Sequence, residues 1–391
     1  DVYKRQLFYN AARSNGYNYW QSGLFAIGGS AMWEMFMECE YPSTNDIIAT
    51  PIGGMAIGEV CYRASDAVLD DRTTGGERVR REVAAFLISP MRGLTRIING
   101  DAWRKRSTTG RQFGTPSVAM EFSAGIRGLE FENEVYDSSL GFSMQFNLEY
   151  GDRFEVKSSR PYDYFRVRAD INIVNSQPLL GQLDITGRLI ARELLEKERS
   201  HMSIGLYQHF DYYDSDTISE VSAKCPYKLG IPASLGCGIM FRDIERNRWV
   251  LDAYLHSNAV ILGSVLSDYY QVDERNYNLA SGFSIKGGAN MVFNRDKFSA
   301  SLSHAYYRLF TWKGYHKYSD LDDISYKVLD AQGDHSAASF IVTEARCDLK
   351  LWRKFYLTLS FTHYMRSTHY RDFGHIKSSS MAARLMLTYK L

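Results

Sequence analysis

The sequence predicts a mainly β protein, a closed antiparallel transmembrane β-barrel of about 12 strands, preceded by a small α-helical domain. Three observations lead to this prediction. From residue 116 to residue 391, runs of strictly alternating apolar and polar side chains repeat between turns. The polar side of these runs is rich in charge, and aromatic residues gather near both ends of the runs. The first hundred residues, in contrast, follow a helical pattern.

The alternation is clearest between residues 140 and 150. Side chains on a strand point alternately to its two faces, so each run must meet an apolar medium on one face and a polar medium on the other. The apolar face of this run carries Leu140, Phe142, Met144, Phe146, Leu148 and Tyr150. Strands of this length are sufficient to cross the hydrocarbon layer of a membrane when they are tilted.

A soluble β-rich binding protein with an inward apolar face would show the same alternation, so the direction of the two faces has to be argued. A single closed sheet of about twelve strands is too wide for side chains to fill, which favours a polar interior. Aromatic residues near both sets of strand ends are typical of two membrane interfaces. At one set of ends we expect Trp249, Trp352, Phe355 and Tyr389, and at the other Tyr212, Tyr213, Tyr269, Tyr270, Tyr307 and Trp312.

The charged residues on the polar faces are therefore expected to line the lumen. Acidic and basic groups are nearly balanced there, so we predict ion pairs that stiffen and narrow the bore. The predicted lumen network comprises Glu121, Glu149, Arg166, Arg168, Asp170, Asp184, Arg188, Arg192, Asp252, Glu344, Arg346, Asp348 and Arg384.

The connections alternate between short and long, as in outer-membrane barrels, where short turns face the periplasm. Short turns are expected at residues 196–199, 245–247, 294–297 and 352–354, and long loops at 211–230, 263–277, 313–335 and 367–377. The connections at 176–180 and 155–163 depart from this rule. The last run alternates up to Leu391, and resembles the final strands that the barrel-insertion machinery recognises, with leucine where phenylalanine is commoner.

Composition narrows the function classes. A net charge of +1 gives no reason to expect nucleic acid as a partner. No apolar stretch has the length of a spanning helix. The five cysteines have no metal-ligand spacing, so we expect no metal and no cofactor; they are either free thiols or include a Cys39–Cys61 or Cys225–Cys237 disulfide.

The helical part is expected to be a periplasmic domain over residues 7–105, with three to four helices, and residues 1–6 are interpreted as a sequencing artefact without a signal peptide. One helix is expected over residues 16–40. A second opens at Ser43 and Asp46, which have the spacing of a capping box. A third is expected over residues 77–99.

Five charged residues of this domain form a candidate polar cluster. Glycine pairs at 28–29 and 53–54, with Gly58, predict close approach of helix backbones. One interpretation is a surface ion pair between Glu59 and Arg63, and the other is a partly buried polar site that holds a metal or a partner. The candidate cluster comprises Glu34, Glu38, Asp46, Glu59 and Arg63.

Several segments of this helical part also resemble a known family. They include Ser30-Ala-Met-Trp-Glu-Met-Phe-Met-Glu, Thr50-Pro-Ile-Gly-Gly-Met-Ala-Ile-Gly-Glu and Gly76-Glu-Arg-Val-Arg-Arg-Glu. Together they resemble an uncharacterised bacterial envelope family, domain of unknown function 3943. The resemblance covers about the first hundred residues and implies a location in the envelope and a following β-rich part, but no activity.

The sequence thus predicts a Gram-negative outer-membrane β-barrel that acts in envelope structure or in porin-like small-solute passage, with a charged, narrow or helix-plugged lumen. Its expected partners are outer-membrane lipid, the barrel-insertion machinery and a periplasmic protein. An outer-membrane lipid hydrolase is an alternative, with His304 and His363 on outward faces. Ser303 and His304 point to opposite sides of a strand, so we assign no catalytic residue.

Overall fold

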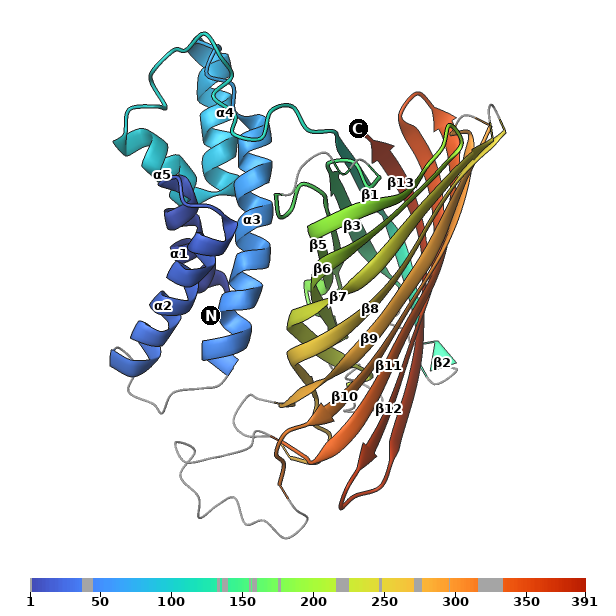
Figure 1. Cartoon of the computed structure of the whole chain (residues 1–391). Helices are drawn as coiled ribbons and strands as arrows, with labels where there is room; N and C mark the ends of the chain where they lie inside the picture. The colour runs from blue at the N-terminus through green and yellow to red at the C-terminus, as the bar shows by residue number, and fades with distance from the viewer. Residues whose placement is uncertain are drawn as a thin grey trace. The chain divides into compact units, whose positions relative to one another are not determined.

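The computed structural model describes residues 2–36, 45–131, 134–135, 140–154, 156, 160–174, 177–215, 225–245, 248–270, 276–294, 296–315 and 333–391. It divides into two compact units, Asp1–Ser117 and Val118–Leu391, which are described separately (Figure 1). The first is helical, and the second is a single sheet.

The helical unit contains α1 (Val2–Ser14), α2 (Tyr19–Phe36), the π-helical segment η1 (Asn45–Ala49), α3 (Thr50–Val68), α4 (Gly75–Ile88) and α5 (Pro90–Ile98). The helix predicted over residues 77–99 is therefore two helices. Pro90 separates them, because proline disfavours a helical conformation at Ser89 and lacks the N–H that a continuous helix needs. Residues 2–6, set apart above as an artefact, belong to α1, and Arg5 of that segment is buried. Ser43 and Glu38 lie outside the described residues.

Glycines on α3 allow α1 to approach closely. A Cβ atom on Gly58 would lie 2.6 Å from the ring of Tyr9, and one on Gly54 would lie 3.0 Å from the Cβ of Arg5. The close backbone approach predicted from the glycines thus occurs at Gly54 and Gly58, with α1 as the neighbour.

This unit buries many charged side chains and exposes many large apolar ones. Arg5, Glu34, Glu59, Arg63 and Asp66 are all at most 3% exposed. Large apolar side chains on α2, α4, α5 and the segment after α5 are exposed instead, namely Trp20, Leu24, Phe25, Ile27, Met32, Met35, Phe36, Val79, Val83, Phe86, Leu87, Leu94, Ile97, Ile98 and Trp103. No helix among the described residues has both the length and the apolar character needed to cross a membrane.

The second unit is a closed antiparallel barrel of twelve strands. Its strands are β1 (Val118–Phe131), β3 (Gly141–Tyr150), β4 (Phe165–Ile173), β5 (Leu180–Glu196), β6 (Ser200–Asp214), β7 (Lys228–Glu245), β8 (Trp249–Leu266), β9 (Tyr277–Phe293), β10 (Phe298–Thr311), β11 (Ser336–Trp352), β12 (Phe355–Tyr370) and β13 (Ile376–Lys390). A two-residue piece, β2 (Glu134–Val135), pairs with the end of β1. Neighbours in sequence pair with each other, and β13 pairs with β1 from Glu121↔Lys390 to Phe131↔Ser380, which closes the sheet.

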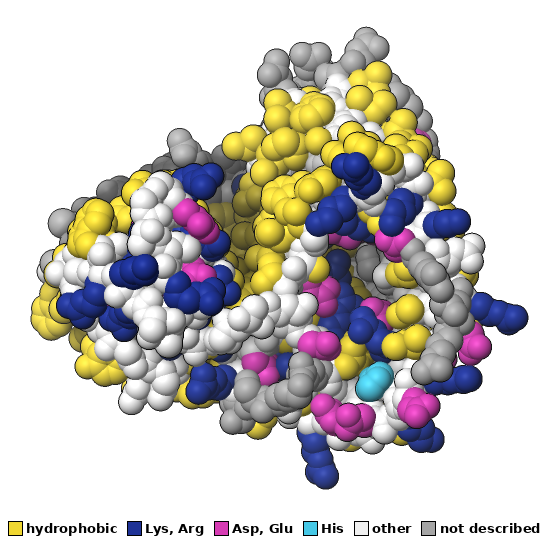
Figure 2. Space-filling model, turned by 90° about the horizontal axis from the view of Figure 1, so that it is seen from above, with side chains coloured by type: hydrophobic (Ala, Val, Ile, Leu, Met, Phe, Trp, Pro, Cys, Tyr) yellow, Lys and Arg dark blue, Asp and Glu magenta, His cyan; other side chains and the backbone are white. Residues whose placement is uncertain are grey.

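The outer wall of the barrel is apolar, as the alternation predicted. Its exposed side chains include Phe122, Ile126, Phe142, Ile204, Ile239, Leu255, Phe283, Ile285, Leu302, Leu349, Leu357, Leu359, Phe361, Met381, Leu385 and Leu387. Apolar outside and charged within, the fold is that of a transmembrane β-barrel. Seen from one end, acidic and basic side chains lie inside the ring of strands (Figure 2).

Most connections fall into the two predicted groups, but the loop predicted as long over residues 367–377 is shorter, because β12 runs to Tyr370 and β13 begins at Ile376. Short turns join β5 to β6, β7 to β8, β9 to β10 and β11 to β12, while the connections from β6 to β7 and from β10 to β11 are long. Val118, where the chain enters the barrel, pairs with Tyr150 at the short-turn end, and Lys390 lies at the same end. Cys61, Cys225, Cys237 and Cys347 are free thiols.

Candidate functional site

An aromatic layer fills the barrel lumen toward the long-loop end. The ring of Tyr213 on β6 lies 5.4 Å from that of Phe340 on β11, and Tyr227 stacks on Tyr364 of β12 at 4.5 Å. Tyr307 on β10 lies 6.0 Å from Tyr213. Spacings of this kind are those of favourable aromatic pairs. Because the rings come from strands on different sides of the barrel, they lie across the bore.

Smaller apolar side chains complete this layer. The buried cluster draws residues from nine strands, β1 and β6 to β13, so it reaches most of the way around the barrel. Its other members are Leu129, Leu229, Ile231, Val260, Val265, Ala280, Leu309, Ala338, Val342 and Ala382. The expectation that twelve strands are too wide for side chains to fill is therefore wrong for this half of the lumen, where aromatic rings span the width.

Ion pairs join non-neighbouring strands next to the aromatic layer. Arg168 on β4 donates through Nη2 to Oε1 of Glu344 on β11 at 2.9 Å. Arg168 also reaches Asp170 through Nε at 3.2 Å, and Arg384 on β13 lies 3.5 Å from Asp170. All four side chains are largely buried. Since a buried charge needs a partner, the pairs that join β4 to β11 and β4 to β13 fix the spacing between these strands.

A polar chamber occupies the short-turn half of the lumen, with a volume of about 320 Å³. Arg346 lies 3.1 Å from Glu121 and 2.9 Å from Asp348, while Lys390 contacts the same two carboxylates at 3.0 and 2.7 Å. Two acids and two bases therefore neutralise one another on this wall. The opening and its charges are visible from the short-turn end (Figure 2).

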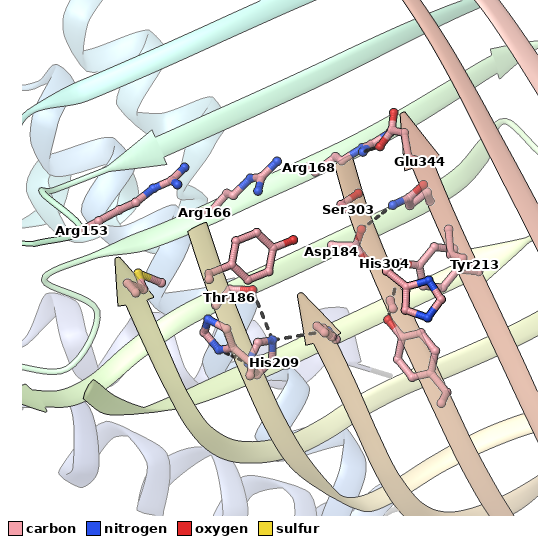
Figure 3. Close-up of a pocket in the computed structure, with 18 of the residues that line it drawn as sticks. Arg153, Arg166, Arg168, Asp184, Thr186, His209, Tyr213, Ser303, His304 and Glu344 are labelled. Carbon is pink, nitrogen blue, oxygen red and sulfur yellow. Dashed lines mark hydrogen bonds and ion pairs between the residues drawn. The ribbon is translucent and has the colours of Figure 1, made fainter. Parts of the chain in front are cut away.

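A second cavity, of about 100 Å³, lies deeper and shares Arg166 and Arg168 with the chamber. His209 on β6 is hydrogen-bonded through Nδ1 to Thr186 at 3.2 Å and through Nε2 to His256 on β8 at 3.2 Å (Figure 3). Lys286 on β9 forms an ion pair with Asp211 of β6. These contacts place imidazole and ammonium groups beside guanidinium groups, so the cavity presents both donors and acceptors to a small polar solute.

Two carboxylates lie opposite one another beside this cavity. Asp184 on β5 and Asp211 on β6 are register partners, which brings their Cβ atoms to about 5 Å. The ammonium group of Lys286 forms an ion pair with one of them, Asp211. Arg166 faces the cavity from β4 with no ion pair among the described residues. The cavity thus combines an acidic wall with a guanidinium group.

The structure places almost all predicted lumen charges inside the barrel, and Arg192 is the exception. A register shift between Arg188 and Ile190 inserts one extra residue into β5. Beyond it Arg192 pairs with Ile204, whose side chain is exposed on the outer wall. A β-bulge exchanges the two faces of a strand, and this one moves Arg192 outside and turns Glu193 inward.

Two tyrosines that were predicted at the membrane interface lie inside the barrel instead. Tyr213 and Tyr307 were expected near the membrane interface, but they are 3% and 1% exposed and belong to the aromatic layer. Their strand faces put them inside, because Tyr213 shares a face with Asp211 and Tyr307 shares one with Ser303. Trp312, Tyr269 and Trp352 are exposed, as predicted.

The helical unit brings Glu59 and Arg63 together in its interior. Arg63 donates to Glu59 at 2.8 Å, and Arg13 of α1 donates to both carboxylate oxygens at 2.7 and 2.9 Å. Tyr9 donates to Glu59 at 2.8 Å. Glu59 is fully buried, so the interpretation as a surface ion pair is wrong. Burial alone raises the pKa of Glu59, but the hydrogen bonds from Arg13 and the charge of Arg63 outweigh it and hold the pKa below its usual range.

Two other candidates of this cluster, Glu34 and Asp46, have partners of their own. Glu34 pairs with Arg5 at 3.3 Å, and Asp46 accepts a hydrogen bond from the hydroxyl of Thr50 at 3.0 Å. Ser30, which accepts a bond from Arg5, donates to the carbonyl oxygen of Asp46. The described part of the chain shows no group of three or more His, Cys, Asp or Glu side chains arranged to hold a metal.

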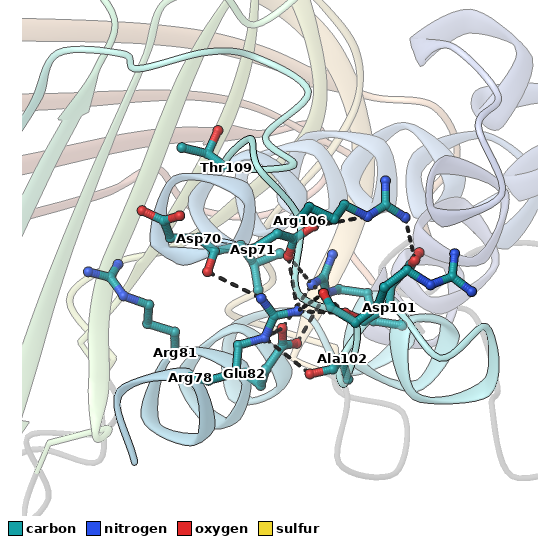
Figure 4. Close-up of polar contacts among 12 residues, drawn as sticks. Asp70, Asp71, Arg78, Arg81, Glu82, Asp101, Ala102, Arg106 and Thr109 are labelled. Carbon is teal, nitrogen blue, oxygen red and sulfur yellow. Dashed lines mark hydrogen bonds and ion pairs between the residues drawn. The ribbon is translucent and has the colours of Figure 1, made fainter. Parts of the chain in front are cut away.

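A further buried network was not predicted. Asp71 pairs with Arg78 at 3.1 Å and with Arg96 at 2.6 Å, and Glu82 pairs with the same two arginines at 3.0 and 2.8 Å (Figure 4). Arg78 also donates to the carbonyl oxygens of Asp70 and Ala102. A sequence signal existed in the spacing of Arg78 and Glu82, one helical turn apart, but Asp71 and Arg96 are distant in sequence.

On the outer wall, two histidines form hydrogen bonds to hydroxyl groups. His304 on β10 lies 2.8 Å from Thr343 on β11, and His363 on β12 lies 2.8 Å from Ser379 on β13. Thr343 is the register partner of both histidines. These side chains therefore form a polar row on a wall that is otherwise apolar. Ser379 was not among the candidates, because its partner strand could not be known from the sequence.

Comparison with known proteins adds a family match. Residues 2–91 match the family described as domain of unknown function, DUF3943. No curated protein matches the chain. Similar solved structures include the NanC porin, at 6% identity and a TM-score of 0.32, covering 70% of this chain and all of that one.

Two further solved structures are OmpT, an outer membrane protein of Vibrio cholerae, and the toluene transporter TodX of Pseudomonas putida. OmpT is 6% identical with a TM-score of 0.30, covering 72% of this chain and 98% of that one. TodX is 9% identical with a TM-score of 0.27, covering 70% and 89%. The fold described here rests on the strand pairing of this chain itself.

Proposed function

We propose that this chain, a DUF3943 domain followed by a twelve-stranded transmembrane barrel, is a protein of the bacterial outer membrane whose barrel is closed at rest. Its role is envelope-structural: the barrel anchors the helical unit in the membrane. Small-solute passage is the alternative function, and it requires the aromatic layer to open. The apolar outer wall and the alternation of short turns and long loops support the location.

The aromatic layer is the observation that carries the proposal. An open porin needs a continuous aqueous path, whereas here Tyr213, Tyr227, Tyr307, Phe340 and Tyr364 are each at most 5% exposed. Ion pairs that join β4 to β11 and β4 to β13 lie next to this aromatic layer. The polar chamber is therefore a vestibule with one open end, at the short turns.

The orientation follows from the same pattern and is part of the proposal. Short turns of outer-membrane barrels face the periplasm. The chain enters β1 at the short-turn end, so the helical unit that precedes it is assigned to the periplasmic side. Partners of the protein would then be outer-membrane lipid and a periplasmic protein that the helical unit meets.

Conductance across a planar lipid bilayer tests the closed lumen. The purified chain should insert without stepwise ion conductance. A variant with Phe340→Ala and Tyr364→Ala, which removes two rings from the layer, should show discrete conductance steps. The matched control is Phe361→Ala, which removes a ring on the outer face of β12, the strand that carries Tyr364. This variant should show no conductance.

Each result decides between the two functions. Large steps from the unsubstituted chain would contradict a closed barrel and favour solute passage. A silent chain that begins to conduct after the two substitutions would establish the aromatic layer as the barrier. Heat-modifiable migration on a detergent gel shows in each case that the barrel is folded.

One observation favours a second candidate function, that of an outer-membrane lipid hydrolase. His363 Nε2 lies 2.8 Å from Ser379 Oγ on the lipid-facing wall. His363 would accept the Ser379 proton during attack on an ester carbonyl and return it to the leaving alcohol, and water would then hydrolyse the acyl-Ser379 ester to fatty acid and free serine. The test is release of fatty acid from phospholipid micelles by the folded chain. Activity that Ser379→Ala abolishes and Ser378→Ala retains would support it, and inactivity of the unsubstituted chain would exclude it.

A further inference from the structure

The helical unit carries an apolar groove between α4 and α5. Its volume is about 490 Å³, within the range of roughly 300 to 1,000 Å³ of small-molecule pockets. Three side chains one helical turn apart on α4, Val79, Val83 and Leu87, form one side. Ile97 of α5 and Trp103 line it as well. These five side chains are between 45% and 75% exposed, so the groove is open.

Close packing of the two helices shapes the floor of the groove. A Cβ atom on Gly93 of α5 would lie 2.5 Å from the ring of Phe86 on α4. Only glycine allows this approach, so the Phe86 ring lies against the backbone of α5. The floor is therefore apolar, and it results from close packing of α4 against α5.

Two of the charged residues that line the groove, Arg78 and Glu82, are paired with buried partners. Glu82 pairs with Arg78 at 3.0 Å and with Arg96 at 2.8 Å. Arg78 pairs in turn with Asp71. The groove therefore presents no free negative charge to a ligand, and its inner surface is almost entirely hydrocarbon.

Basic side chains lie at one end of the groove. Lys105 lines it next to Trp103, and Arg104 lies between them in sequence; both basic side chains are exposed. In the described part of the chain neither forms an ion pair. Tryptophan beside basic side chains is the combination that membrane interfaces select, with the ring at the level of the headgroups.

We propose that this groove binds an anionic phospholipid, with an acyl chain along Val83, Leu87 and Ile97 and the phosphate near Arg104 and Lys105. Charge complementarity identifies the headgroup, since the open end is cationic and the groove carries no free negative charge. The apolar surface of α2, α4 and α5 would lie against the same lipid layer. This inference is independent of whether the barrel conducts.

Photo-crosslinking of the full chain in lipid nanodiscs tests the proposal. The probe is phosphatidylglycerol with a diazirine in its acyl chain, compared with the same probe on phosphatidylcholine. Adducts are mapped by peptide mass spectrometry. We expect adducts in peptides over residues 75–105 with phosphatidylglycerol, and weaker labelling there with phosphatidylcholine. Adducts on the outer wall of the barrel provide an internal standard in each sample.

Two variants locate the binding. Val83→Trp fills the groove at an exposed position and should reduce the adducts over residues 75–105 to background while the barrel adducts are unchanged. Leu24→Trp is the matched control on α2 and should leave both unchanged. Each cation near an anionic lipid contributes about fivefold to binding, so Arg104→Glu with Lys105→Glu should lower groove labelling by about 25-fold or more.

The following outcomes would overturn the proposal. Adducts confined to the barrel, or groove labelling that Val83→Trp does not change, would show that no lipid occupies the groove. Equal labelling by both headgroups, unaffected by the charge reversals, would contradict an anionic ligand. Protein–protein cross-links to residues 79–97 in place of lipid adducts would assign the groove to a protein surface.

Discussion

The carboxylate of Glu59 accepts two hydrogen bonds from the guanidinium group of Arg13, at 2.7 and 2.9 Å, across the contact between α3 and α1. Arg63 and Tyr9 bind the same carboxylate, which is inaccessible to solvent. One buried carboxylate therefore binds two buried guanidinium groups. The stability of the helical unit should depend strongly on this single side chain.

Glu59→Gln should destabilise the helical unit by about 3–5 kcal/mol, because it removes the buried carboxylate with which Arg13 pairs. Hydrogen exchange of peptides from α1 and α3, measured on the full chain in detergent, checks this. The control is Glu77→Gln, which removes an exposed pair with Arg81 and should cost about 0–1 kcal/mol. Equal exchange in the two variants would contradict the buried pair.

The helical unit should also lose stability at acid pH. The pKa of Glu59 is lower in the folded unit than in an unfolded chain, where it is about 4.3. A lowered pKa stabilises the folded form above the unfolded pKa, and this contribution is lost as the pH falls through the folded pKa. Exchange in α1 and α3 should therefore rise below about pH 4. In Glu59→Gln the same peptides should lose most of that dependence.

Exchanging Arg168 and Glu344 for each other should preserve their ion pair, whereas changing one of them alone should break it. Glu344→Ala leaves Arg168 with Asp170 alone in the lumen and should lower the stability of the barrel by about 3 kcal/mol. The double variant Arg168→Glu with Glu344→Arg restores the pair between β4 and β11, although it places a second carboxylate on β4 beside Asp170. It should therefore recover part of the loss, as measured by the temperature at which gel migration changes. A double variant as unstable as the sum of its single changes would show that the two residues do not interact.

Arginine on the outer wall should be costly in the middle of the strands and tolerated near their ends. Phe361→Arg, within β12, should destabilise the barrel by about 2–4 kcal/mol, because the side chain faces the hydrocarbon core. Leu351→Arg, one residue from the end of β11, should cost about 0–1 kcal/mol. Unfolding by urea in phospholipid vesicles measures both. Similar values at the two positions would contradict a membrane around this wall.

The alternation of side chains predicted the strands, and the strand number and the aromatic strand ends favoured a membrane barrel over a soluble β protein. The alternation assigned faces correctly wherever the strands are regular, as from Gly141 to Tyr150 and from Ile376 to Lys390. It failed for Arg192 because a bulge shifts the register by one residue, and nothing in the local sequence marks the extra residue. Face assignments beyond such a point require the pairing of the neighbouring strand.

The contents of the lumen were predicted in part. Charges that alternate with apolar residues indicated the ion-pair network, but the partners of Arg168 and Asp211 come from strands far apart in sequence. The aromatic layer was missed, because a tyrosine near a strand end can face either the membrane interface or the lumen. The two orientations are distinguished only by the strand face: Tyr213 lies two residues from Asp211 on β6 and therefore shares its lumen-facing side.

In the helical unit, spacing alone brought Glu59 and Arg63 together, since they lie one turn apart. Exposure could not be predicted in the same way. Large apolar residues on α2, α4 and α5 are exposed, whereas ion pairs involving Arg13, Asp66 and Asp71 are buried. Helical periodicity identifies two faces, but it does not say which of them is inside.

The inverted polarity of the helical unit has a practical consequence for anyone who isolates it. A fragment ending before Val118 would expose Trp20, Phe36, Leu87 and Trp103 to water, and such a surface favours aggregation over a dispersed monomer. Expression without the barrel should therefore give inclusion bodies or adhesion to membranes. Biochemistry on this region is best carried out with the intact polypeptide in an amphiphile.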